Sequence, residues 1–276
     1  MKPAAFDYAR PDSLAEAVGL LDSGAVKCLA GGQSLGPMLN LRLVRPRLLV
    51  DITRIAELGH AGTDGDWLVL GACVTHAAIE DGRVPDLTGG VLAGVARNIA
   101  YRAVRTRGTI GGSLAHADPA ADWIACLAAL GAEVELDGGD GRRRVQVAEL
   151  MTGVFETVIK PGEILTAVRV PRLGAEARWG YYKVCRKPGE FAEAIGAVLA
   201  DPERGRCRAV IGATDTVPIV LADASPLFGG DPTPPLAPRF DAAQAREVLR
   251  AHGLGADAYE LQVHAVALER AVRAMP

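Results

Sequence analysis

The segments Ala30-Gly31-Gly32-Gln33-Ser34-Leu35 and Gly108-Thr109-Ile110-Gly111-Gly112-Ser113 each combine a pair of adjacent glycines with a following serine. Adjacent glycines open positive φ angles that other residues avoid, so successive N–H groups can point into one concavity. Such a concavity binds phosphate oxygens, and a serine hydroxyl at its edge adds another donor. Two such turns in one chain predict a ligand with two linked phosphates, as in a dinucleotide.

Either turn alone is only weakly predictive, because a glycine-pair turn is more often a tight loop than a phosphate site. Two other nucleotide-binding motifs fit less well. The Rossmann motif needs Gly-x-Gly-x-x-Gly after a strand, and although Asp51 lies at the distance of its acidic residue, the glycine spacing is wrong. A P-loop needs Gly-Lys-Ser/Thr at the end of the turn, and neither turn has it.

The composition limits the class of protein and its partners. With 276 residues, the chain can form one large domain or two moderate ones. A net charge of −3, with arginines interspersed among acids, argues against a nucleic acid partner. We find no segment with the character of a signal peptide or of a membrane span, which needs about 20 apolar residues.

The five cysteines are far apart and include no Cys-x-x-Cys pair. This spacing predicts buried thiols of a reduced compartment, and it is not that of a disulfide framework or of iron–sulfur ligands. We therefore expect a cytoplasmic protein that brings no metal ligand set of its own. The cysteines are Cys28, Cys73, Cys126, Cys185 and Cys207.

Apolar periodicity predicts an α+β protein with a change of character near residue 175. A capping box of Ser13 and Glu16 begins the first helix, and Asp118 with Pro119 has the chemistry of a later helix start. Beyond residue 175 we expect an antiparallel sheet packed on helices. The predicted strands cover residues 27–30, 48–52, 67–72, 132–136, 144–147, 164–170, 180–185, 194–199 and 207–213.

Both glycine segments extend into longer motifs. The first continues with Pro37-Met38 and Leu41-Arg42, and the second with Leu114-Ala115-His116-Ala117-Asp118-Pro119-Ala120-Ala121-Asp122. They resemble the AGG(Q/H)SLxPMxxLR and TIGGSLAHADPAAD signatures of one flavoprotein group. This group is the FAD-binding medium subunit of molybdenum hydroxylases, in the xanthine dehydrogenase and carbon monoxide dehydrogenase family. The resemblance covers nearly the whole chain.

The resemblance implies an α+β fold with two domains. Residues 1–175 would form an FAD-binding domain of the vanillyl-alcohol-oxidase type (PCMH-type), split into two subdomains. Residues 176–276 would form a C-terminal domain of the carbon monoxide dehydrogenase flavoprotein type. That domain combines a three-stranded antiparallel sheet with a short helical bundle.

The resemblance also implies which residues contact FAD. Both glycine turns would wrap the pyrophosphate, with Gln33, Ser34, Thr109 and Ser113 adding side-chain donors. Asp122 matches a position that contacts the flavin nucleotide, although an acid in a first helical turn also favours the helix dipole without any ligand. The implied contacts are Ala30, Gly31, Gly32, Gln33, Ser34, Leu35, Ile99, Thr109, Ile110, Gly111, Gly112, Ser113, Asp122, Leu165, Tyr181 and Lys183.

Two single positions belong to this set. Leu165 falls where relatives contact the flavin through the backbone. Ile99 matches a position that lines the isoalloxazine, and it suits a hydrophobic core nearly as well. The resemblance implies non-covalent FAD, and it places neither a catalytic residue nor a metal ligand in this chain.

Tyr181-x-Lys183-x-x-Arg186 resembles a Tyr-x-Lys-x-x-Arg-Arg segment that lies near the isoalloxazine in this family. A tyrosine there can stack on the ring, and a lysine can stabilise negative charge on the reduced flavin. Lys187 and Glu190 stand where relatives carry arginine and aspartate, and these changes keep the charge but lose the arginine fork. We therefore assign no role to Lys187 or Glu190.

Four arginines precede the second glycine turn, and such a run is usually a solvated face. Contact with an anionic cofactor or a partner subunit is the alternative. Tyr101 stands where relatives often carry histidine or proline, and no role follows for it. The arginines are Arg97, Arg102, Arg105 and Arg107.

The function implied by the resemblance is that of an oxidoreductase subunit. Its FAD would pass electrons from the [2Fe–2S] clusters of a small partner to an external acceptor, while a large molybdopterin subunit oxidises the substrate. The implied assembly is a dimer of heterotrimers. Two alternatives stay open: a self-contained flavin oxidase or reductase of the same fold, and a binding module in which FAD is structural.

Overall fold

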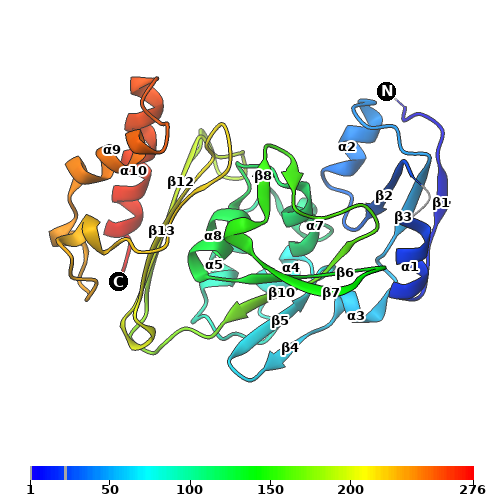
Figure 1. The fold of residues 1–276 in the computed structure, drawn as a ribbon, viewed down its shortest axis with the longest axis horizontal. Coiled ribbons are helices and arrows are strands. Elements are labelled where there is room, and N and C mark those ends of the chain that lie inside the picture. The colour runs from blue at the N-terminus through cyan, green and yellow to red at the C-terminus, as the bar shows by residue number, and fades with distance from the viewer. Residues whose placement is uncertain (1, 22–23) are drawn as a thin grey trace.

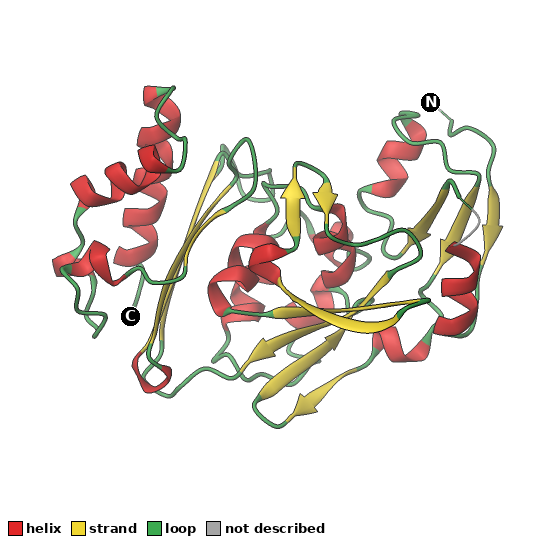
Figure 2. Cartoon of the chain, in the orientation of Figure 1, coloured by secondary structure: helices red, strands yellow, loops and turns green. Residues whose placement is uncertain are grey.

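The computed structural model describes residues 2–21 and 24–276. The molecule is elongated, with an N-terminal sheet at one end and a pair of helices near the C-terminus at the other (Figure 1). Three layers of strands follow one another along the long axis (Figure 2). Within the described residues, no helix is both long and apolar enough to cross a membrane.

The N-terminal unit is a three-stranded sheet of order β1-β3-β2, in which both strand pairs are parallel. Ser13 and Glu16 begin the first helix as predicted, because the Glu16 amide donates to the Ser13 hydroxyl at 3.2 Å. Parallel strands end at the same edge, so the turn that follows β2 emerges beside the end of β3. The elements are β1 (Asp7–Ala9), α1 (Leu14–Leu21), β2 (Val26–Leu29), α2 (Leu35–Asn40), β3 (Leu48–Asp51) and α3 (Ala56–Gly59).

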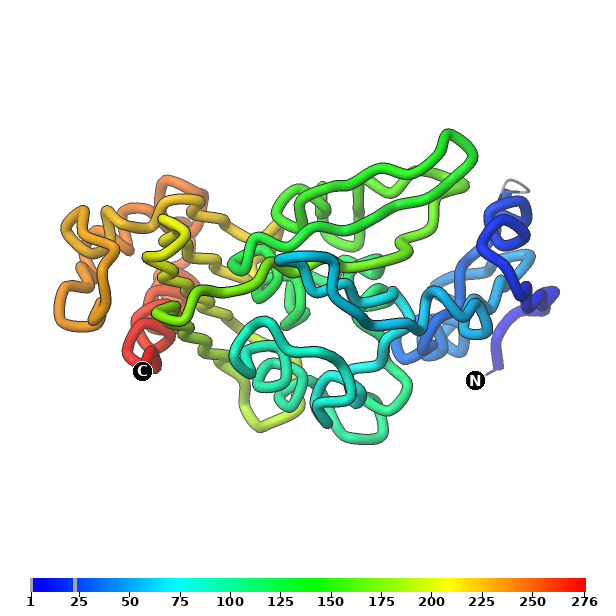
Figure 3. The backbone as a smooth tube through the Cα atoms, turned by 90° about the horizontal axis from the view of Figure 1, so that it is seen from below, coloured from blue at the N-terminus to red at the C-terminus, as the bar shows by residue number. Residues whose placement is uncertain are grey.

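The central unit is a five-stranded antiparallel sheet of order β4-β5-β10-β6-β7 with a group of short helices. Figure 3 shows helices α4 and α5 (teal) and the β6–β7 hairpin (green) on opposite sides of the long axis. The elements are β4 (Ala61–Asp64), β5 (Trp67–Gly71), α4 (His76–Glu80), α5 (Val91–Arg97), α6 (Arg102–Arg105), α7 (Ile110–His116), α8 (Asp122–Leu130), β6 (Glu133–Gly138), β7 (Gly141–Gln146), β8 (Met151–Gly153), β9 (Glu156–Thr157) and β10 (Ile164–Pro171).

The C-terminal unit is a four-stranded antiparallel sheet of order β11-β12-β13-β14. The family pattern implied three strands; the fourth is the short β14, which pairs with β13. A β-carbon on Gly180 would lie 1.9 Å from the carbonyl oxygen of Ala271, so glycine lets α10 pack directly on this sheet. The elements are β11 (Arg178–Val184), β12 (Ala194–Asp201), β13 (Arg206–Gly212), β14 (Ile219–Leu221), α9 (Ala242–Ala251) and α10 (Ala258–Arg273).

Helix α8 joins the central and C-terminal units. It lies between the central sheet and strands β12 and β13 (Figure 1), and all 9 of its residues are buried. A helix that is buried on every side needs apolar residues all round, and its sequence DWIACLAAL meets this requirement after its first residue, Asp122. Strand β12 is also buried along its whole length, because α8 covers one face and α10 the other.

One predicted helix start is wrong. Asp118 and Pro119 do not begin α8, whose first residue is Asp122 with Ala121 as the N-cap. The Asp118 carboxylate instead accepts the Ala120 amide at 2.9 Å, in a turn that follows the left-handed residue Ala117. The predicted strands are all present, with ends shifted by a few residues, whereas the shortest strands, such as β8 and β9, were not predicted.

Candidate functional site

The two glycine turns lie against each other, although they are far apart in the sequence. A β-carbon on Gly31 would lie 2.0 Å from the carbonyl oxygen of Arg107 and 2.8 Å from Cα of Gly108. Any side chain at Gly31 would therefore push the two turns apart. The fold thus places both predicted phosphate-binding segments on one surface.

The first turn leaves its backbone donors unused. Gly32 has a φ of +70°, and α2 begins three residues later. Within the described part of the chain, the amides of residues 31–35 donate no hydrogen bond. The Gln33 side chain folds back over the turn, where its amide donates to the Gly31 carbonyl at 3.1 Å. A row of unpaired N–H groups is what a phosphate site requires, so this turn fits the pyrophosphate of FAD.

The second turn is built differently. The prediction that its glycine amides form an open concavity is wrong. The Gly111 amide donates to the carbonyl of Ala72 at 3.0 Å, and the Gly112 amide donates to the Thr109 hydroxyl at 3.1 Å. Neither glycine has a positive φ. A β-carbon on Gly111 would lie 2.5 Å from that of Ala72, so this glycine serves close packing of α7 against the chain after β5. The Ser113 hydroxyl is half-buried and has no partner among the described residues.

Three of the predicted FAD contacts meet in one buried cluster. The Lys183 ammonium lies 2.9 Å from a carboxylate oxygen of Asp122, and their side chains are only 8% and 9% exposed. The Tyr181 hydroxyl donates to the same carboxylate at 2.7 Å. Burial, followed by the charge of Asp122, raises the pKa of Tyr181 well above its ordinary value, so the phenol stays protonated. This cluster fastens β11 to the start of α8.

Ile99 lies in a short loop that two cations hold. Lys183 donates to the Asn98 carbonyl at 3.0 Å, while Arg105 donates to the carbonyls of Ile99 at 2.9 Å and Ala100 at 3.0 Å. Ala100 has a φ of +41°, a conformation that costs energy for a non-glycine residue. The loop is thus fixed from both sides, with Ile99 half-buried against the core.

The arginine run is not a uniform solvated face. Arg105 is 9% exposed, and its guanidinium forms two hydrogen bonds with Glu80 as well as those to the loop. Arg102 pairs with both Glu80 and Asp81 at 2.7 Å. Sequence reasoning missed the structural role of Arg105, because its partners come from two other segments of the chain. The two hydrogen bonds from the Arg105 guanidinium hold the pKa of Glu80 below its ordinary value.

Leu165 lies on β10 beside a bulge that shifts the register with β6 before Ala167. The carbonyl of the next residue, Thr166, accepts the Ala72 amide at 2.9 Å. Because Ala72 also packs on Gly111, Leu165 is joined through this strand to the second glycine turn.

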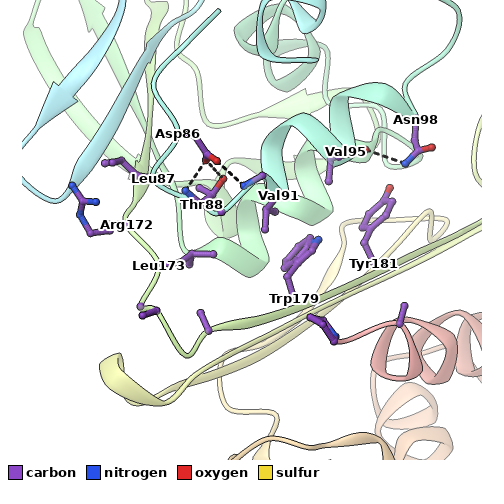
Figure 4. A pocket seen from close by; sticks show the side chains of 18 residues that line it. Asp86, Leu87, Thr88, Val91, Val95, Asn98, Arg172, Leu173, Trp179 and Tyr181 are labelled. Atoms are coloured by element: carbon purple, nitrogen blue, oxygen red, sulfur yellow. Dashed lines mark hydrogen bonds between the residues drawn. The ribbon is translucent and has the colours of Figure 1, made fainter. Parts of the chain in front are cut away.

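Two cavities lie outside the glycine turns. One of about 780 Å³ is bounded by α5, the loop before it, residues 172–177 and β11. In Figure 4, Trp179 and Tyr181 project side by side from β11 toward α5, and their rings are parallel with centroids 6.3 Å apart. A second cavity of about 500 Å³ is lined by Tyr101 and Phe191, which are 57% and 73% exposed. Sequence reasoning gave no role to either aromatic residue of this second cavity.

Lys187 and Glu190 belong to a surface ion pair. Their charged atoms are 3.5 Å apart, and Arg186 contacts the same carboxylate at 3.2 Å. His116, at the end of α7, is half-buried with its ring 5.0 Å from that of Phe155. Burial lowers the pKa of His116 below its ordinary value.

The fold is that of the FAD-binding subunits of molybdenum hydroxylases. Residues 4–173 match the family described as FAD binding domain in molybdopterin dehydrogenase, and the chain belongs to this family. It is an oxidoreductase subunit that carries FAD. Its fold is the PCMH-type FAD domain followed by a C-terminal antiparallel sheet with helices.

Relatives of this class cover most of the chain. The chain is 38% identical over 210 residues to the 6-hydroxypseudooxynicotine dehydrogenase complex subunit alpha of Paenarthrobacter nicotinovorans, spanning 75% of this chain and 71% of the relative. It is 35% identical over 279 residues to the carbon monoxide dehydrogenase medium chain of Afipia carboxidovorans, spanning 99% and 97%.

Solved structures agree with this assignment. Reconstituted CO dehydrogenase from Oligotropha carboxidovorans superposes with a TM-score of 0.87 at 32% identity, covering 99% of this chain and 98% of that one. Quinoline 2-oxidoreductase from Pseudomonas putida 86 gives a TM-score of 0.85 at 31% identity, with the same coverage. These relatives favour the subunit function over a self-contained flavin oxidase or reductase.

Proposed function

We propose that this chain passes electrons from the [2Fe–2S] clusters of a small partner subunit, through its FAD, to an external acceptor. A large molybdopterin subunit would oxidise the substrate. Bound FAD supplies the redox chemistry, since flavins exchange electrons both singly and in pairs. The observation that carries this proposal is the row of unpaired amides at residues 31–35, pressed against the second glycine turn.

The chain's own residues would bind and orient the cofactor. The amides of residues 31–35 and the hydroxyls of Ser34 and Ser113 would hold the pyrophosphate. The loop that contains Ile99, which Lys183 and Arg105 hold in place, would line one side of the isoalloxazine ring. Residues 1–175 would form the FAD-binding domain and residues 176–276 the C-terminal domain. The other contacts implied by the resemblance belong to the same proposal.

The names of the relatives support an assembly with partner subunits. They include a complex subunit alpha, a medium chain and a medium subunit. We propose that this chain joins one large and one small partner, that two such heterotrimers associate, and that the complex is cytoplasmic. No nucleic acid or membrane partner is part of this proposal.

Co-purification from the native host, with a tag on this chain, tests the assignment. We expect a large and a small partner, with flavin and iron–sulfur absorbance bands in the eluate. Acid precipitation should release the yellow flavin into the supernatant, because the FAD is held without a covalent bond. A lone yellow protein that reduces its flavin with substrate would instead identify a self-contained flavoenzyme.

Replacing Gly31 by alanine should weaken FAD binding about tenfold or more. The added methyl group would lie 2.0 Å from the Arg107 carbonyl oxygen, and overpacking of this kind costs about 1–3 kcal/mol. The matched control is Gly36→Ala in α2, where a β-carbon meets no atom within 4 Å. Dissociation constants from titration of the apoprotein with FAD make the comparison. Equal affinity of both variants would show that contact between the turns does not matter for binding.

A further inference from the structure

A buried histidine, His76, lies behind the second glycine turn. It is the first residue of α4 and is 5% exposed. Its backbone amide donates to the Gly108 carbonyl at 2.9 Å. Its ring occupies the space next to Gly108, because a β-carbon there would lie 2.8 Å from both Cδ2 and Nε2. His76 therefore contacts the turn through its backbone and through its ring.

A hydrogen bond fixes the orientation of this ring. The indole nitrogen of Trp123, on α8, donates to Nδ1 of His76 at 3.0 Å. An indole N–H can only donate, so Nδ1 must be unprotonated and the imidazole neutral, with its proton on Nε2. Burial, with a smaller contribution from the charge of Arg105, lowers the pKa of His76 to about 4. The neutral form thus prevails over the whole physiological range.

The position of Gly108 matters for the predicted cofactor site. Gly108 lies between Arg107, whose carbonyl touches Gly31, and Thr109, whose hydroxyl caps α7. A shift of the Gly108 backbone would move the Arg107 carbonyl and the Thr109 hydroxyl together. His76 is the side chain that packs beneath it, and Trp123 is the residue that keeps His76 in place.

We propose that His76 is a positioning residue of the FAD site. Its imidazole, held by Trp123, keeps the backbone of Arg107, Gly108 and Thr109 against the first glycine turn, so that both turns form one binding surface. This inference rests on the proposed binding of FAD. It does not give His76 a contact with the cofactor.

Two substitutions separate this role from simple packing. His76→Asn places a carbonyl oxygen near the position of Nδ1, so it can still accept the indole N–H of Trp123. His76→Gln places its amide near the position of Nε2 and leaves the indole without an acceptor. The glutamine variant therefore leaves the buried indole N–H of Trp123 unpaired. The free-energy cost of such an unpaired donor is enough to raise the dissociation constant for FAD about tenfold.

The experiment is FAD titration of the full-length apoprotein, together with the indole ¹H–¹⁵N resonance of Trp123, assigned with a Trp123→Phe variant. We expect His76→Asn to bind FAD within about threefold of the wild type and to retain a hydrogen-bonded indole shift. We expect His76→Gln to bind about tenfold more weakly and to lose that shift. His76→Phe, which keeps the ring without an acceptor, should behave like the glutamine variant.

The possible results are distinct. A wild-type protein that does not bind FAD would contradict the proposed function and leave the His76–Trp123 bond to be judged from the indole resonance alone. If the wild type binds FAD and the asparagine and glutamine variants bind it equally well, the positioning role is excluded. A wild-type indole resonance at the position of a solvent-exposed tryptophan would also overturn it.

Discussion

Replacement of Lys183 by methionine should lower the free energy of unfolding by about 3–5 kcal/mol, because the buried Asp122 carboxylate loses its cation. The two charged groups are 2.9 Å apart, and both side chains are less than one tenth exposed. The Tyr181 hydroxyl and the N-terminal end of α8 offset only part of the loss. Methionine keeps the unbranched chain, so the measured change reports loss of the ammonium group, with its bonds to Asp122 and Asn98, and not a cavity.

The same substitution at Lys187 is the matched control. Lys187 is 64% exposed and lies 3.5 Å from Glu190, and an exposed pair of this kind contributes about 0–1 kcal/mol. Urea unfolding at saturating FAD compares both variants with the wild type. A double variant, Asp122→Leu with Lys183→Met, should recover most of the stability, since no buried charge is left unpaired. A loss no larger for Lys183→Met than for Lys187→Met would rule out the buried pair.

This ion pair connects the two parts of the molecule. Asp122 begins α8, whereas Lys183 and Tyr181 come from β11 of the C-terminal sheet. Lys183 also donates to the Asn98 carbonyl, next to Ile99. The C-terminal sheet therefore helps to fix a loop of the proposed FAD site. Through this contact, a segment remote from both glycine turns would influence the proposed FAD site.

The local parts of the fold could be predicted from the sequence. The Ser13–Glu16 cap and the strands β6 and β7 depend on residues that are close in the chain. Helix α8 shows where this reasoning ends. Its sequence is apolar on nearly every side, but nothing local shows that β12 and β13 cover one of those sides.

The glycine turns illustrate the same limit at the site. Both contain adjacent glycines, yet only Gly32 uses a positive φ, while Gly111 allows close contact with Ala72. The difference depends on a partner that lies far away in the sequence. Arg105 is similar: the run of arginines predicted solvent exposure, but Glu80 and the loop carbonyls bury its guanidinium.

His76 also predicts how stability depends on pH. Its native pKa of about 4 lies below the ordinary value of 6.5, so the unfolded chain takes up a proton that the native protein excludes. Stability from this residue is complete above pH 6.5 and is lost as the pH falls from 6.5 toward 4. The difference between the two pKa values corresponds to about 3 kcal/mol. We expect the wild type to lose this amount, in addition to the contribution of its carboxylates.

Comparison with His76→Phe isolates the histidine from the other titrating groups. Glu80, whose pKa lies below its ordinary value of 4.5, loses its contribution only at the acid end of this range and below it, and it does so in both proteins. Urea unfolding at pH 7, 6, 5 and 4, at one fixed saturating FAD concentration, should therefore give stability curves that converge toward low pH. The phenylalanine variant should be the less stable protein at pH 7, because its Trp123 indole lacks an acceptor. The difference in free energy of unfolding between the two proteins should narrow as the pH falls, because only the wild type contains a buried histidine that must stay neutral. Curves that stay parallel would mean that His76 titrates alike in the native and unfolded chains. Burial of the ring could then not be what lowers its pKa.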